Sequence, residues 1–161
     1  YWLDGADEKC VISKANMDMT LDVMAHSLVY WTQDLLRHGL MGQGGRLFAM
    51  TSSGSTSDWQ GYGAVSAAKA ALEAHIRQHA VELAPQGITA NAICAGVTDT
   101  AALRKIPGST EMIEDATARN PYKRLTTPED VANAIVAFST PAVAWLNGNT
   151  LYVDGGEEVA G

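Results

Sequence analysis

Apolar residues recur at helical spacing along the first long segment of the chain, from about residue 20 to residue 41. Such spacing is typical of an amphipathic helix that buries one face. The residues before it, 1–16, are polar and irregular, and glycines at 42, 44 and 45 end the pattern. We therefore expect one long helix over residues 20–41. Its apolar stripe consists of Leu21, Met24, Leu28, Trp31 and Leu35.

Short apolar runs bounded by glycine, serine or polar residues predict buried strands. Three such runs occur, over residues 46–51, 88–95 and 149–153. A second long helix, rich in alanine, is expected between the first two, from Tyr62 to about Ala84. Pro85 and Gly87 then stop it.

Two shorter helices are expected in the last third of the chain. Residues 109–119 suit a short acidic helix, and a second helix should begin at Thr127 and run to about Ser139. Thr127 can cap that helix, and Pro128 fits the first helical position. Helices that alternate with short apolar strands predict an α/β fold with a parallel sheet, whose carboxyl-terminal edge should carry function. Three strands make a thin sheet, so we expect that the amino-terminal strands of a doubly wound, Rossmann-like sheet are missing.

The composition of the chain excludes several classes of binding partner. The chain has 161 residues, 47% of them hydrophobic and 18% charged, which suits a single globular domain. A net charge of −7 argues against nucleic acid or an anionic membrane as the main partner. No apolar stretch is long enough to span a membrane. Cys10 and Cys94 are too few for a disulfide framework, so we expect a reducing, cytoplasmic setting with Cys94 buried. The four histidines lack convincing metal-ligand spacing, and no metal site is expected.

Candidate chemistry gathers around Tyr62 and Lys69. Lys69 is an isolated cation among alanines, and it either extends along the helix to reach water or serves a site. A separation of seven residues places both side chains within about 20° of the same helix face. That face lies near a strand end that carries Ser52. A nearby cation favours the phenolate, so such a tyrosine can donate a proton to a developing oxyanion.

Several motifs together resemble the short-chain dehydrogenase/reductase superfamily, over about residues 18–158. A Ser-Ser-Gly sequence at 52–54 precedes the Tyr62 and Lys69 pair, which opens an alanine-rich helix. Residues 87–96 resemble the strand that leads into the nicotinamide-contacting turn. Residues 127–132 resemble the helix start before the last strand, and residues 151–156, ending in Asp-Gly-Gly, resemble that strand. The resemblance implies a Rossmann-like reductase.

Departures from the classical pattern of this superfamily indicate which of its subgroups the chain resembles. Classical members place three residues between Tyr and Lys, whereas six separate Tyr62 from Lys69, and Val65 stands at the classical tyrosine position. The longer spacing resembles the divergent enoyl-acyl-carrier-protein reductases, in particular the third bacterial type. Three extra helical residues move the phenol by about 4.5 Å, which suits charge that develops on a thioester oxygen remote from the hydride acceptor. Met24 replaces the usual helix asparagine, and Val97 the usual proline.

The resemblance implies that the protein is an NAD(P)H-dependent oxidoreductase that reduces trans-2-enoyl thioesters of acyl-carrier protein or coenzyme A in fatty-acid elongation. Tyr62 would protonate the enolate oxygen, Lys69 would bind the nicotinamide ribose, and Ser52 would line the catalytic site. Residues 99–125 would form a flap over the acyl chain. The remaining cofactor contacts implied, to NADPH or NADH, are Gly96, Val97, Thr98 and Thr100.

The family's glycine-rich phosphate loop is not found, because the glycines of residues 42–45 precede a strand rather than a helix. We therefore expect residues 1–161 to form the carboxyl-terminal part of one reductase domain, to lack the adenosine half of the site and to be inactive alone. Two alternatives stay open: a carbonyl or 3-oxoacyl reductase, and a non-catalytic oligomeric remnant. The resemblance also implies a homo-oligomer formed through helices 20–41 and 62–84.

Overall fold

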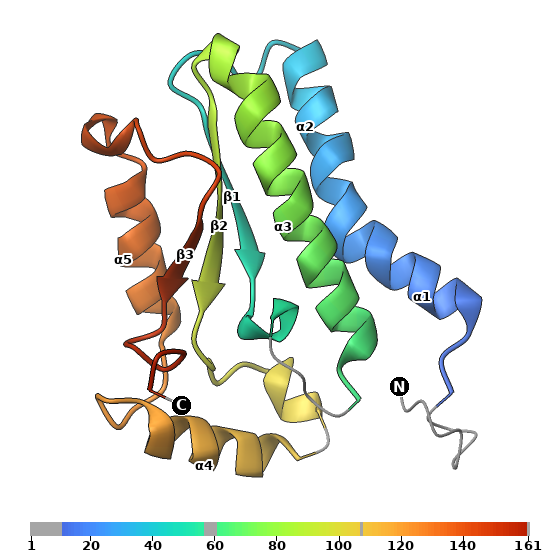
Figure 1. Cartoon of the computed structure of the whole chain (residues 1–161), viewed down its shortest axis with the longest axis vertical. Coiled ribbons are helices and arrows are strands. Elements are labelled where there is room, and N and C mark those ends of the chain that lie inside the picture. The colour runs from blue at the N-terminus through green and yellow to red at the C-terminus, as the bar shows by residue number, and fades with distance from the viewer. Residues whose placement is uncertain (1–10, 57–60, 107, 161) are drawn as a thin grey trace.

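The computed structural model describes residues 11–56, 61–106 and 108–160. Helices connect the short strands along the chain. They lie on both sides of these strands (Figure 1). With α1 and α2 taken as one helical stretch, the order of helix, strand, helix, strand, helix, helix and strand is the predicted one. The elements are α1 (Lys14–Leu21), α2 (Ser27–Arg37), β1 (Arg46–Thr51), α3 (Gly63–Leu83), β2 (Thr89–Ala95), α4 (Ser109–Arg119), α5 (Pro128–Phe138) and β3 (Thr150–Val153).

The three strands form one parallel sheet in the order β1-β2-β3. Arg46 pairs with Thr89 and Thr51 with Cys94, so β1 ends one residue before β2 does. Ala95 pairs with Val153 at the end of β3. The predicted α/β class and parallel sheet are confirmed. All three carboxyl ends therefore lie at one edge, where α4 crosses in Figure 1.

The core lies between the sheet and α3. Every residue of β2 up to Cys94 is buried, because this strand has a neighbour on each side and α3 packs on it. Leu72, Ile76 and Ala80 of α3 are buried at helical spacing against the sheet. In Figure 1, α5 lies on the side of the sheet away from α3, next to β3. The largest fully buried side chains are Ile76, Ile88, Ile93 and Asn91.

The first helical stretch differs from the expected single helix over 20–41. Helix α1 begins at Lys14, where Ser13 caps it through Asn16 N, so residues 14–16 are helical rather than irregular. A π-helical turn, Asp22–His26, then separates α1 from α2, and α2 ends at Arg37. The apolar stripe is also only partly right. Trp31 is 70% exposed, whereas Ala25 and Thr32 are the buried residues of this stretch.

The later elements follow their local signals closely. Thr127 caps α5 in a capping box, in which its hydroxyl accepts from Asp130 N and the Asp130 carboxylate accepts from Thr127 N. Helix α4 has the bounds that its sequence predicts. The glycines of residues 42–45 form a turn before β1, at the edge of the sheet opposite to its carboxyl ends.

Candidate active site

Ser52 and Tyr62 meet at the carboxyl end of β1. Ser52 directly follows the strand, and Tyr62 is the residue that precedes the first turn of α3. Their hydroxyl oxygens lie 3.4 Å apart. The structure therefore brings two of the three expected catalytic residues together, with both hydroxyls at the carboxyl-terminal edge of the sheet. Val65, one turn further along α3, is half-buried.

Gly54 allows the Tyr62 ring to lie against the backbone of the loop after β1. A Cβ at position 54 would stand 2.3 Å from Tyr62 Cε1 and 2.8 Å from its Cδ1, distances so short that the ring would have to shift. Gly54 belongs to the short helical turn Ser53–Ser55. Gly54 belongs to the Ser-Ser-Gly motif at 52–54, but that motif alone does not predict this role for the glycine. Its absent side chain leaves the space that the ring occupies.

Lys69 is half-buried, and its side chain reaches from α3 to β1. Its Nζ donates to the carbonyl oxygen of Met50 in β1 at 2.7 Å. Burial lowers the pKa of Lys69, because it disfavours the charged form, while Cys94 and Glu73 act in the opposite direction. Lys69, within α3, and Tyr62, at the cap of that helix, thus both reach the region where β1 ends.

A polar cluster that sequence reasoning did not single out lies behind Lys69. The buried Thr51 hydroxyl donates to a carboxylate oxygen of Glu73 at 2.6 Å. Glu73 stands one helical turn after Lys69. Cys94 at the end of β2 is a free, buried thiol, as expected, and burial together with nearby carboxylates raises its pKa to about 12. The spacing of four between Lys69 and Glu73 was the available signal.

The turn after β2, expected to contact nicotinamide, is held by two distant segments. Gly96 N donates to Val153 O of β3 at 3.3 Å, and Val97 O accepts from Thr126 N at 3.2 Å. Thr98 pairs with Thr126 in an isolated bridge, and its hydroxyl donates to Gly96 O at 3.0 Å. The Thr100 hydroxyl accepts from Leu103 N at 3.1 Å and so begins the next helical turn. Thr98 is half-buried, whereas Thr100 is exposed.

Glu157, which was not among the predicted site residues, lies directly behind this turn. It is 5% exposed and follows β3 by a few residues. Val97 N donates to its two carboxylate oxygens, at 3.2 and 3.4 Å. A Cβ at Gly96 would stand 2.8 Å from Glu157 Oε2, so the glycine permits the close approach. The signal in the sequence was an acid directly after the Asp154-Gly155-Gly156 motif.

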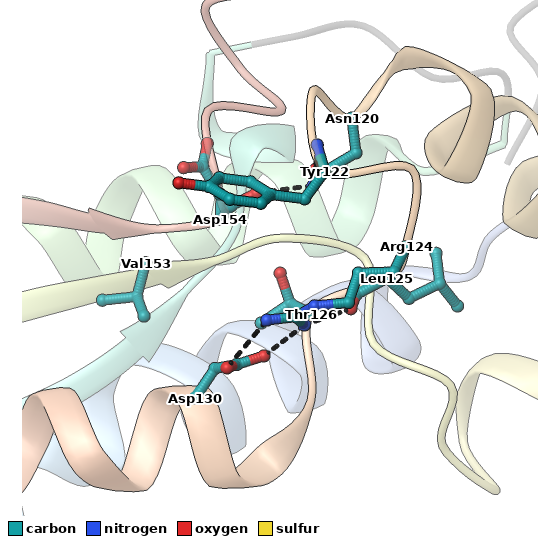
Figure 2. Close-up of a pocket in the computed structure, with 9 residues that line it drawn as sticks. Asn120, Tyr122, Arg124, Leu125, Thr126, Asp130, Val153 and Asp154 are labelled. Carbon is teal, nitrogen blue, oxygen red and sulfur yellow. Dashed lines mark hydrogen bonds and ion pairs between the residues drawn. The ribbon is translucent and has the colours of Figure 1, made fainter.

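A cavity of about 280 Å³ lies beside this region, between the end of β3 and the start of α5 (Figure 2). In its lining, the Arg124 guanidinium donates to both carboxylate oxygens of Asp130. This pair holds the pKa of Asp130 well below its usual range, with help from the N–H and hydroxyl of Thr127. Its lining residues are Asn120, Tyr122, Arg124, Leu125, Thr126, Asp130, Val153, Asp154 and Gly155.

Two further findings concern metal binding and membrane crossing. In residues 11–56, 61–106 and 108–160, no three His, Cys, Asp or Glu side chains are grouped so as to hold a metal ion. In the same part of the chain, no helix combines the length and the apolar character that a membrane crossing requires.

Known proteins resemble this chain along most of its length. Residues 6–158 match the family described as Enoyl-(Acyl carrier protein) reductase. Enoyl-[acyl-carrier-protein] reductase [NADH] FabI from Nostoc sp. is 32% identical over 149 residues, which are 92% of this chain and 57% of that protein. The chain thus spans a little over half the length of such relatives.

Solved structures give the same result. The enoyl-acyl carrier protein reductase of Bacillus cereus, determined with NADP+, superposes with a TM-score of 0.86 at 26% identity, over 92% of this chain and 57% of that one. The reductase LugOII, described as promiscuous and catalysing a keto-reduction, superposes with a TM-score of 0.79 at 27% identity over the same shares. With the family match over residues 6–158, these comparisons show that the chain belongs to the enoyl-(acyl carrier protein) reductase family of short-chain dehydrogenases/reductases.

Proposed function

We propose that the protein containing this chain reduces the carbon–carbon double bond of trans-2-enoyl thioesters with NADH or NADPH, in fatty-acid elongation. The observation that carries the proposal is the meeting of the Tyr62 and Ser52 hydroxyls at the carboxyl end of β1, with Lys69 reaching the same strand end. Six residues separate Tyr62 from Lys69. That spacing places the acid just before α3, three residues ahead of Val65, the position that suits a carbonyl reductase.

The described residues fit the nicotinamide end of a dinucleotide. The Lys69 ammonium is half-buried and its hydrogen-bond acceptor is a neutral carbonyl, which suits a cation that exchanges this contact for ribose hydroxyls. The N–H groups of Gly96 and Val97 already donate within the protein. We therefore assign the carboxamide contact of this turn to the backbone of Thr98, with Thr100 nearest the pyrophosphate. When bound, the reduced nicotinamide would supply the hydride.

The chain's own residues would handle the negative charge. As the β-carbon gains hydride, charge develops on the thioester oxygen, and the Tyr62 hydroxyl would donate its hydrogen bond and then its proton there. Ser52 would line the site and orient the phenol from 3.4 Å. Lys69 would hold the ribose and stabilise the phenolate that Tyr62 leaves behind.

Residues 99–125 would form the flap over the acyl chain, which acyl-carrier protein or coenzyme A would carry. Helix α4 lies within this segment and crosses the carboxyl end of the sheet (Figure 1). Met112 and Ile113 of α4 are half-buried. Both side chains would supply apolar contacts to the acyl chain.

A second candidate is the reduction of a carbonyl group, because a structure described as a keto-reductase also superposes on this chain. The deciding experiment measures NADH and NADPH oxidation by the full natural protein, with a trans-2-enoyl thioester and a 3-oxoacyl thioester side by side. Faster turnover of the enoyl thioester supports the proposal, and preference for the 3-oxo substrate refutes it. A protein that binds neither nucleotide would be the non-catalytic remnant.

The exposed faces of α2 and α3 suit contact with a second copy of the protein. Helix α2 exposes Tyr30 and Trp31, and α3 exposes Ala67, Ala70 and Ala74 along one face. Small residues permit close helix approach, so we propose a homo-oligomer formed through these helices in the cytoplasm. Sedimentation of the full protein tests this, and a Trp31→Glu variant should sediment as a smaller species.

A further inference from the structure

Glu157 is a buried acid whose position calls for an explanation. A carboxylate removed from water is costly unless charged or polar groups compensate it. Here the compensation comes from the turn after β2, since Val97 N donates to both oxygens of Glu157. This N–H exists because residue 97 is valine, as proline would have none. The acid and the turn are 60 residues apart in the sequence.

The same carboxylate also contacts the end of α4. Arg119, the last residue of α4, lies with its Nη2 3.5 Å from Glu157 Oε1. The next residue, Asn120, is buried, and its amide donates to Asp154 O at 2.8 Å. Glu157 therefore contacts two segments at once, the turn that precedes residues 99–125 and the helix that ends within them.

We propose that Glu157 is a positioning residue that fixes the cofactor-binding turn through the Val97 N–H and couples it to α4 through Arg119. The inference rests on the proposed function, because the turn at residues 96–98 is where that function places the nicotinamide. Glu157 touches neither cofactor nor substrate in this proposal. It fixes the backbone that does.

The ionisation of Glu157 decides how well it holds the turn. Charged and titratable groups face it from three elements: Arg119 of α4, Asp154 after β3, and Cys94 of β2, whose pKa Glu157 helps to raise. Burial raises the pKa of Glu157, partly offset by Val97 N–H and Arg119. Protonation turns one carboxylate oxygen into a donor and removes the charge that attracts Arg119. The turn should therefore loosen under mildly acidic conditions.

The test compares Glu157→Ala, Glu157→Gln and, as a matched control, Glu158→Gln in the full natural protein. Glu158 is the neighbouring acid and is exposed. We expect Glu157→Ala to raise the KM for NADH or NADPH about tenfold, since it removes a charge-assisted contact. The kcat should change less than twofold, and hydrogen exchange of a peptide spanning residues 95–100 should accelerate. Glu157→Gln, which keeps an acceptor, should raise KM less and flatten its rise at acidic pH.

The outcomes separate the possible roles. Unchanged hydrogen exchange at residues 95–100 in Glu157→Ala overturns the proposal, and so does a lower Tm with an unchanged nucleotide KM. If Glu157→Ala does not fold, the pH profile of Glu157→Gln decides instead, and an unaltered profile refutes the proposal. Should the unaltered protein oxidise neither nucleotide, the proposed function fails, and the role in cofactor binding falls with it. The exchange measurement then still reports whether Glu157 holds the turn.

Discussion

The ring of Tyr62 lies so close to the backbone of Gly54 that a Cβ at position 54 would stand 2.3 Å from Tyr62 Cε1. The loop after β1 thus forms the surface against which the proposed acid rests. Ser52, at the start of the same loop, holds the phenolic oxygen at 3.4 Å. Backbone and side chain of one loop therefore define where the phenol stands.

Gly54→Ala should impair catalysis more than stability. The added methyl group displaces the Tyr62 ring, and a misplacement of about 1 Å can reduce the rate by about two orders of magnitude. Steady-state kinetics on the enoyl thioester and a thermal melt would measure both effects. Gly42→Ala is the matched control, because a Cβ there meets nothing within 4 Å. Equal rates for the two variants would show that the ring position does not matter.

Tyr62→Phe should lower kcat by about 10²- to 10⁴-fold, the contribution typical of a general acid, while the fold persists. Loss of the hydroxyl removes the proton donor and the contact with Ser52. Circular dichroism and single-turnover kinetics would check the fold and the chemical step. Val65→Ala serves as the control at the position where classical members carry their tyrosine. Near-normal turnover by Tyr62→Phe would remove this residue from the mechanism.

Lys69→Met should weaken nucleotide binding without lowering stability at neutral pH. Because burial lowers the pKa of Lys69 in the folded state, the folded protein binds fewer protons than the unfolded chain. Folding is therefore disfavoured below that lowered pKa and gains stability as the pH rises from it toward the ordinary lysine value. Removing the charge relieves this cost. Fluorescence titration with NADH and thermal melts at pH 7 would test it, and unchanged nucleotide affinity would contradict the assignment.

Protonation of His75, which contacts His26 between α3 and the first helical stretch, should destabilise the protein. His26 Nδ1 and His75 Nε2 lie 2.9 Å apart, and such a bond needs one unprotonated nitrogen. Burial, His26 and His79 lower the pKa of His75. Stability should be complete above the ordinary histidine pKa of about 6.5 and fall as the pH drops below it. Melts between pH 5 and 7.5 should show a weaker dependence for His75→Gln.

Thr127→Ala should lower the free energy of unfolding by about 1 kcal/mol, the usual effect of losing a helix cap. The substitution removes the hydroxyl that accepts from Asp130 N, which then keeps only the Thr127 carbonyl oxygen as its acceptor. Thr110→Ala, at an exposed position of α4, is the control and should change stability by a few tenths of a kcal/mol at most. Denaturant titration measures both, and equal effects would mean that the cap contributes nothing.

Local signals predicted most elements well. The run at residues 46–51 became β1, and the Thr127-Pro128 sequence started α5, because apolar runs and helix caps act over a few neighbouring residues. The first helix was predicted less well. The sequence pattern does not reveal the π-helical turn at Asp22–His26, and Trp31 lies on an exposed face although it shares the apolar stripe.

The sequence by itself determined the α/β class and the parallel strands, since both follow from periodicity. It predicted that Tyr62 and Lys69 share one helix face, and the structure places Tyr62 at the cap of α3 and Lys69 within that helix. Only the tertiary structure decided how Gly54 accommodates the phenol ring and how Glu157 holds the turn after β2. Those contacts depend on strand register and on segments up to 60 residues apart being packed together. From the sequence alone, an acid after an Asp-Gly-Gly motif is expected to be exposed to water. Only the packing of the fold shows that Glu157 is buried.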